Sequence, residues 1–191
     1  MKLIPPVLLS LLLLQGCAGG FIIAAGTAVA VSGDERSISQ QIDDDNLAAS
    51  AIDKVVTLNE YHHDMRINIV TNNGYLLLIG QVDTQMTSNK IENELGKLKG
   101  VKAVYNQLRV NHPIGAIQQT RDTWITTKVK SLLSNHDKID LLKIKVVTEN
   151  GEVFLIGQVT QTMSDYATGV ARKITGVKQV VRVFDLIPEK S

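Results

Sequence analysis

The sequence predicts an α+β protein in which a small module with the element order αββαβ occurs twice in tandem. The segment Ile79-Gly80-Gln81-Val82 recurs 77 residues later as Ile156-Gly157-Gln158-Val159. An Asn-Gly pair precedes each copy, at Asn73-Gly74 and at Asn150-Gly151. Apolar residues with helical spacing come before each pair. We expect each module to be a three-stranded mixed sheet covered on one face by two helices.

Composition limits the classes of function. Only 4% of the 191 residues are aromatic, so the core must consist mainly of Val, Ile and Leu, which disfavours a large aromatic-lined pocket. The net charge of +1 excludes the strongly basic balance of a nonspecific nucleic-acid binder. The net charge nevertheless differs in sign between the two halves of the chain. Residues 34–110 hold eight Lys/Arg against eleven Asp/Glu, and residues 111–191 hold eleven Lys/Arg against eight Asp/Glu.

The first 16 residues are interpreted as a secretory signal peptide. Lys2 precedes an apolar stretch, Leu3–Leu14, that is too short to span a bilayer. The stretch leads to Leu14-Gln15-Gly16-Cys17, which resembles the lipobox of bacterial lipoproteins and contains the only cysteine. The resemblance implies that Cys17 carries a diacylglycerol and an N-acyl chain, and no other cofactor is expected. A plain secretory peptide or a redox thiol is the alternative.

Residues 17–44 are interpreted as the lipidated N-terminus and a linker. Small apolar residues fill Ala18–Ser32, and a polar, acid-rich stretch follows. This composition favours a tether, with contact between the apolar part and the membrane surface as the alternative. Inner-membrane lipoproteins usually have Asp after the cysteine, and here Ala18 follows it. By that resemblance the expected location is the outer membrane, facing the periplasm.

Each module is expected to begin with an amphipathic helix. We predict a first module at residues 45–111, a linker at 112–121 with Pro113 and Gly115, and a second module at 122–191. The helices are expected at 46–58 and 123–134, with Asp45 and Asp122 as their N-caps. The expected core residues of these helices are Ala48, Ile52, Val55 and Val56 in the first, and Ile125, Val129, Leu132 and Leu133 in the second.

The remaining elements follow in the same order in both copies. An Asn-Gly pair accepts positive φ at both central positions of a type I′ turn, so each pair predicts a β-hairpin. A helix ended by glycine and a last strand follow, and a helical crossover places that strand parallel to its neighbour. The expected ranges are strands 67–70, 75–82 and 103–110 with helix 84–99, and strands 144–147, 152–159 and 179–187 with helix 160–175.

Gly80 and Gly157 fall inside predicted strands, where glycine reduces order and packing. We interpret both as structural glycines, at a bulge or where a helix approaches the sheet closely. Close approach of the backbone to a ligand is the alternative.

No catalytic constellation and no metal site are predicted. The four histidines fall in expected loops or linkers, without the spacing of a metal-binding helix; they are His62, His63, His112 and His136. Asp43-Asp44-Asp45 lacks the ligand series and internal glycine of a calcium loop. We interpret the chain as a binding protein and not as an enzyme.

The single tryptophan, Trp124, is the best candidate for a binding residue. At about 100° per residue it projects roughly 125° away from the expected core stripe, and Lys128 and Ser131 share its flank. Tryptophan and lysine together suit the headgroup level of an anionic bilayer. Leu47 and Ala51 are expected at the matching positions of the first module. Packing of the indole against the other module or the linker is the alternative.

The repeated pattern resembles the BON module of bacterial osmotically induced and nodulation proteins. The motifs are the hairpins with their inner glycines, followed by Gly100-Val101-Lys102-Ala103-Val104 and Gly176-Val177-Lys178-Gln179-Val180. Two modules after a lipobox, with Asp122–Val129 opening the second, resemble a family of division- and outer-membrane-stress-associated lipid-binding lipoproteins of Gram-negative bacteria. The resemblance covers essentially the whole chain.

That family resemblance implies a non-enzymatic protein whose second module binds anionic phospholipid such as phosphatidylglycerol. The candidate phospholipid-binding residues are Thr123, Trp124, Thr127, Lys128 and Ser131. An adaptor that contacts outer-membrane assembly or division proteins without direct lipid binding is the alternative. No nucleic-acid partner is expected.

Overall fold

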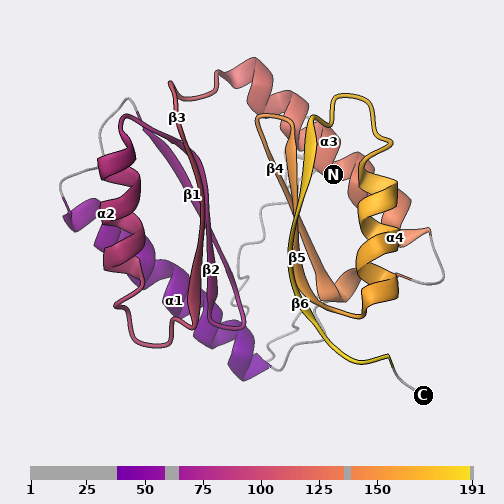
Figure 1. The fold of residues 1–191 in the computed structure, drawn as a ribbon, viewed down its shortest axis with the longest axis horizontal. Coiled ribbons are helices and arrows are strands. Elements are labelled where there is room, and N and C mark those ends of the chain that lie inside the picture. Colours follow the sequence, from indigo (N-terminus) through magenta and orange to yellow (C-terminus); the bar gives the residue numbers. More distant parts are fainter. Residues whose placement is uncertain (1–37, 59–64, 136–138, 190–191) are drawn as a thin grey trace, which may run out of the picture. The chain divides into compact units, whose positions relative to one another are not determined.

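The computed structural model of the chain describes residues 38–58, 65–135 and 139–189 (Figure 1). The predicted signal peptide, Cys17 and the tether up to residue 37 lie outside the described residues, as do His62, His63 and His136. None of the helices within the described ranges is both long enough and apolar enough to cross a membrane.

Two modules with the same element order follow one another, as the sequence predicts. The first contains α1 (Ile38–Thr57), β1 (Arg66–Asn72), β2 (Tyr75–Val82), α2 (Gln85–Leu95) and β3 (Ala103–Val110). The second contains α3 (Ala116–Ser134), a short 3-10 helix (Leu141–Lys143), β4 (Ile144–Glu149), β5 (Glu152–Val159), α4 (Gln161–Ala171) and β6 (Gln179–Leu186). The α+β class and the tandem αββαβ architecture are confirmed.

Both sheets have the predicted mixed topology. The strand orders are β1-β2-β3 and β4-β5-β6, with an antiparallel hairpin and then a parallel pair in each. The hairpins turn at Asn73-Gly74 and Asn150-Gly151, where all four residues have positive φ. This is the backbone that a type I′ turn requires, and it explains the Asn-Gly pairs.

Each module has its own apolar core between its two helices and one face of its sheet (Figure 1). In the first module, the helices contribute Leu47, Ala51, Val55, Ile91 and Leu95. In the second, they contribute Ile125, Val129, Leu133, Ala167 and Ala171. The predicted stripe on the first helix is confirmed for Val55 but wrong for Ile52 and Val56, which are 54% and 57% exposed. Leu132, expected in the second core, is 40% exposed.

The opposite faces of the two sheets form a third apolar cluster. Leu77 and Ile79 of β2 pack with Phe154 and Ile156 of β5, and all four side chains are buried. The two pairs occupy equivalent positions, 77 residues apart. Each sheet therefore buries both faces, which explains why β2 and β5 are nearly continuous apolar stretches.

The first helix of each module begins earlier than predicted. Helix α1 already includes Ile38, and α3 begins at Ala116, so residues 116–121 of the predicted linker are helical. Gly115 precedes α3 with an extended backbone and no side-chain cap, and the residues after it include the strong helix formers Ala116 and Arg121. Asp45 and Asp122 lie inside helices, so neither is an N-cap.

Gly80 and Gly157 must be glycines because the neighbouring strand lies too close to leave room for a side chain. A Cβ atom at Gly80 would overlap the carbonyl oxygen of Arg66, and a Cβ atom at Gly157 would overlap that of Lys143. Both glycines also have positive φ, and the strand register passes through Gly80 and ends at the pair of Gly157 with Ile144 without a bulge. The expected bulge or close helix is therefore wrong, and the space a side chain would need is filled by β1 or β4.

Candidate functional site on helix α3

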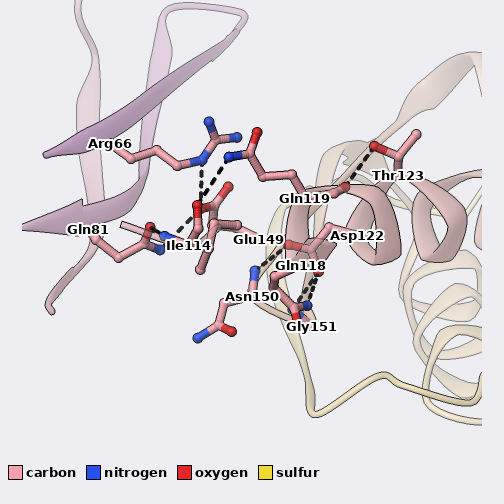
Figure 2. A network of polar contacts seen from close by, with 10 residues as sticks. All are labelled: Arg66, Gln81, Ile114, Gln118, Gln119, Asp122, Thr123, Glu149, Asn150 and Gly151. Atoms are coloured by element: carbon pink, nitrogen blue, oxygen red, sulfur yellow. Dashed lines mark hydrogen bonds and ion pairs between the residues drawn. The ribbon is translucent and has the colours of Figure 1, made fainter. Parts of the chain in front are cut away.

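Asp122 fixes helix α3 to the β4–β5 hairpin. Its carboxylate accepts hydrogen bonds from the backbone N–H groups of Asn150 at 2.7 Å and Gly151 at 2.8 Å (Figure 2). The side chain is 4% exposed. In the first module, Asp44 accepts the corresponding bonds from Asn73 and Gly74. The only carboxylate of α3 is thus used inside the module.

The opposite side of α3 is an exposed stripe of apolar and cationic residues. Ile117, Arg121, Trp124 and Lys128 follow one another at spacings of four, three and four residues, which places them within about 60° of one another around the helix. Ile117 is 74% exposed and Trp124 is 54% exposed. The indole is therefore not hidden between the modules. We call these four residues the α3 stripe.

The surface of α3 carries only positive charge. Besides the buried Asp122, its charged residues are Arg121, Lys128 and Lys130, all exposed. None of these three forms an ion pair with a residue that the structure describes. Their charges are therefore available to an anionic surface.

Helix α1 has the opposite character. Asp43, Asp45 and Asp53 are exposed, and its only cation, Lys54, pairs with Glu94 of α2 at 3.0 Å. An anionic membrane would repel this helix and attract α3. The difference in charge between the two halves of the sequence is thus concentrated on the two equivalent helices.

The five predicted lipid-binding residues divide into two groups. Trp124, Lys128 and Ser131 lie on the exposed side of α3, whereas Thr123 and Thr127 lie on its flank beside a cavity. The predicted match of Trp124 and Lys128 with Leu47 and Ala51 is wrong, because both of the latter are buried. Since Asp44 corresponds to Asp122, the true counterparts are 78 residues earlier, at Asn46 and Ser50.

The cavity has a volume of about 280 Å³ and lies between α3, β4 and the start of β1. The residues lining it are mostly polar: Arg66, Gln119, Asp122, Thr123, Thr126, Thr127, Val146, Val147, Thr148 and Glu149. Two of the threonine hydroxyls donate to helix carbonyl oxygens, from Thr123 to Gln119 and from Thr127 to Thr123. Glu149 is 5% exposed and accepts a hydrogen bond from Arg66 Nε at 3.1 Å.

Sequence reasoning missed Ile117, Arg121 and the cavity residue Arg66. The first two fell in the predicted linker, although their spacing to Trp124 and Lys128 is helical and could have revealed a longer helix. Arg66 and Glu149 are 83 residues apart, and no local pattern signals their pairing.

Comparison with known proteins identifies the repeated module. The BON domain family matches residues 35–112 and residues 121–188. The chain belongs to the BON-domain family. Outer membrane lipoprotein DolP of Haemophilus influenzae is 38% identical over 171 residues, covering 90% of this chain and 89% of that protein. This similarity confirms the predicted family of dual BON-domain lipoproteins and the outer-membrane location.

Two further relatives align over most of their length. The 21 kDa hemolysin of Actinobacillus pleuropneumoniae is 38% identical over 154 residues, covering 81% of this chain and 79% of that protein. Osmotically-inducible protein Y of Escherichia coli is 25% identical over 190 residues, covering 93% of each.

Proposed function

We propose that this BON-domain lipoprotein binds anionic phospholipid such as phosphatidylglycerol through helix α3 of its second module, and thereby supports the integrity of the cell envelope. The single observation behind the proposal is the α3 stripe, where the exposed indole of Trp124 lies between Arg121 and Lys128, two cations that form no ion pair with any described residue. An indole at headgroup level keeps its N–H hydrated while its ring contacts acyl chains. Each cation near an anionic surface adds about 1 kcal/mol of attraction.

Attachment at Cys17 makes weak lipid binding sufficient. Acyl chains contribute about 0.8 kcal/mol per buried CH₂, and several chains on one cysteine give lasting attachment. A tethered α3 stripe then meets the periplasmic face of the membrane at high effective concentration. The stripe is expected to orient the protein and select lipid, while the anchor supplies most of the affinity.

Cys17→Ser is expected to abolish lipidation, because the sulfur accepts the diacylglycerol and the chain has no other cysteine. Metabolic labelling with a radioactive fatty acid, followed by isolation of the protein, measures this. Label on the serine variant equal to that on the wild type would show that the anchor lies elsewhere.

Trp124→Ala is expected to weaken binding of residues 34–191, which form one compact unit, to phosphatidylglycerol vesicles by about tenfold. The thermal melt should stay unchanged, because the indole is half-exposed and leaves no core cavity. Vesicle co-sedimentation measures the affinity. Binding should also fall as salt rises, because the screening length shortens.

Ile52→Ala is the matched control, since Ile52 of α1 is also 54% exposed but lies among aspartates. It should leave vesicle binding unchanged. Equal losses in the two variants would show that exposed apolar area, and not the α3 stripe, governs binding. A Trp124→Ala protein without a cooperative melt would place the indole in a structural role.

The exposed residues of helix α1 favour a second function, which is contact with a partner protein. Its exposed Ile42, Ile52 and Val56 lie on the side away from the core, together with Asp45 and Asp53. Apolar residues mixed with carboxylates suit a partner with basic residues better than they suit an anionic membrane. An outer-membrane assembly or division protein is the corresponding candidate, and crosslinking from a photoreactive residue at position 52 in cells tests it.

A further inference from the structure

Arg66 of the first module reaches across to the second module at the edge of the cavity. Its Nε atom donates to Glu149 at 3.1 Å, and Gln81 Nε2 donates to the same carboxylate oxygen at 3.1 Å (Figure 2). Gln81 in turn accepts a hydrogen bond from the backbone N–H of Ile114. Glu149 therefore holds the guanidinium in place through one nitrogen only.

The two Nη atoms of Arg66 have donors left for a ligand. Among the described residues, the guanidinium donates only to Glu149, and the side chain is 35% exposed. A guanidinium presents its N–H groups in a planar fork that matches two oxygens of a phosphate. Arg66 thus lines the cavity with unused donors on its two Nη atoms, while its Nε stays paired with Glu149.

The threonine side of the cavity offers the complementary groups. Thr123 and Thr127 donate their hydroxyl hydrogens to helix carbonyl oxygens, so the lone pairs of their oxygens remain as acceptors. Acceptors of this kind suit a ligand that carries hydroxyl groups. A phosphodiester group by itself does not use them, because it offers only acceptors at neutral pH.

We propose that this cavity binds a glycerophosphate group, with the phosphate on Arg66 and the free glycerol hydroxyls donating to Thr123 and Thr127. The proposal rests on the proposed function, because it assigns headgroup selectivity to the side of the same helix. The volume of about 280 Å³ holds roughly nine water-sized groups, close to the size of a phosphoglycerol headgroup. Since Arg66 belongs to the first module, selectivity requires both modules.

The test compares vesicles of equal charge and different headgroup. Phosphatidylglycerol and phosphatidylserine both carry one net negative charge, but only the former has a second glycerol, with free hydroxyls, as its headgroup. Residues 34–191 should bind phosphatidylglycerol vesicles about tenfold more tightly. Arg66→Gln should lower that affinity to the phosphatidylserine level and leave phosphatidylserine binding unchanged. Arg109→Gln is the matched control, because Arg109 also pairs across the modules, with Glu152 at 2.9 Å, but does not line the cavity.

Thr127→Val keeps the proposal testable if Arg66→Gln fails to fold. Valine has nearly the shape of threonine and removes the hydroxyl group, which takes away the acceptor lone pairs and the exposed hydrogen bond to the Thr123 carbonyl oxygen, and residue 127 is exposed on the helix. It should reduce the preference for phosphatidylglycerol severalfold without changing the melt. Two outcomes would overturn the cavity assignment. One is equal binding of both vesicle types by the wild type, and the other is an unchanged preference for phosphatidylglycerol in a folded Arg66→Gln or Thr127→Val protein.

A soluble probe separates this proposal from membrane binding itself and shows whether the ligand must come from a lipid. Glycerophosphoglycerol should bind the wild type in calorimetric titration, whereas glycerol and inorganic phosphate alone should bind much more weakly. If the wild type binds neither vesicle type, the proposed function fails. The titration with glycerophosphoglycerol then tests the cavity assignment by itself. Heat of binding in the wild type that is absent in Arg66→Gln supports the assignment. No heat of binding in the wild type refutes it.

Discussion

Gly157→Val is expected to lower the free energy of unfolding by at least about 3 kcal/mol, beyond the usual cost of an overpacked site. The first added carbon already overlaps the carbonyl oxygen of Lys143, which belongs to the backbone and cannot rotate away. Positive φ adds strain for a β-branched residue. Because Gly157 pairs with Ile144 in the hairpin, the expected response is separation of β4 from β5. Urea denaturation followed by circular dichroism measures the loss.

Gly169→Ala provides the control for this substitution. Gly169 lies in α4 with no atom near the position of an added Cβ, so alanine should raise stability by about 0.5–1 kcal/mol through helix propensity. A Gly157→Val protein as stable as the wild type would mean that β4 does not approach β5 as described. It would also restore the interpretation of Gly157 as a point of contact for a ligand.

Asp122→Ala is expected to destabilise the second module by about 2–4 kcal/mol. The substitution removes three charge-assisted hydrogen bonds, one of them from Gln118, and leaves the backbone N–H groups of Asn150 and Gly151 without their acceptor. Asp122→Asn retains an acceptor oxygen and should cost about half as much. Chemical denaturation monitored by Trp124 fluorescence reports directly on α3.

The exposed Asp53 of α1 supplies the comparison, and Asp53→Ala should change stability by less than about 0.5 kcal/mol. Hydrogen exchange adds a local measurement: in Asp122→Ala, the amides of Asn150 and Gly151 should exchange much faster than in the wild type. Unchanged protection of both amides would show that the turn does not depend on the helix.

The strands were predictable because their signals are local. Each Asn-Gly pair specifies a turn by its own backbone preference, and the alignment of the two copies then locates both sheets. The starts of α1 and α3 were not predictable from caps, because the predicted N-caps Asp45 and Asp122 lie inside the helices. Asp122, like Asp44 of the first module, instead binds a hairpin that is 28 or more residues away. Because Asp44, and not Asp45, corresponds to Asp122, the predicted alignment of the two helices was wrong by one residue. Leu47 and Ala51 were therefore matched incorrectly with Trp124 and Lys128.

The candidate site likewise has a part that the sequence could predict and a part that it could not. The exposure of Trp124 follows from its angle relative to Ile125 and Val129, which a single helix determines. Arg66 could not be assigned to the cavity from the sequence, because its position depends on how the two sheets pack. Contacts between distant segments reflect the tertiary arrangement, and hydrophobic periodicity does not encode them.

The cluster between the two sheets also bears on why the chain contains two modules and not one. Leu77 and Ile79 pack with Phe154 and Ile156, which are their own counterparts in the second copy. A surface that packs against an equivalent of itself is the arrangement of a twofold-symmetric homodimer. The chain therefore holds within one polypeptide the kind of contact that such a dimer forms between two copies, with halves that differ in charge. A single module by itself would leave the apolar face of its sheet uncovered.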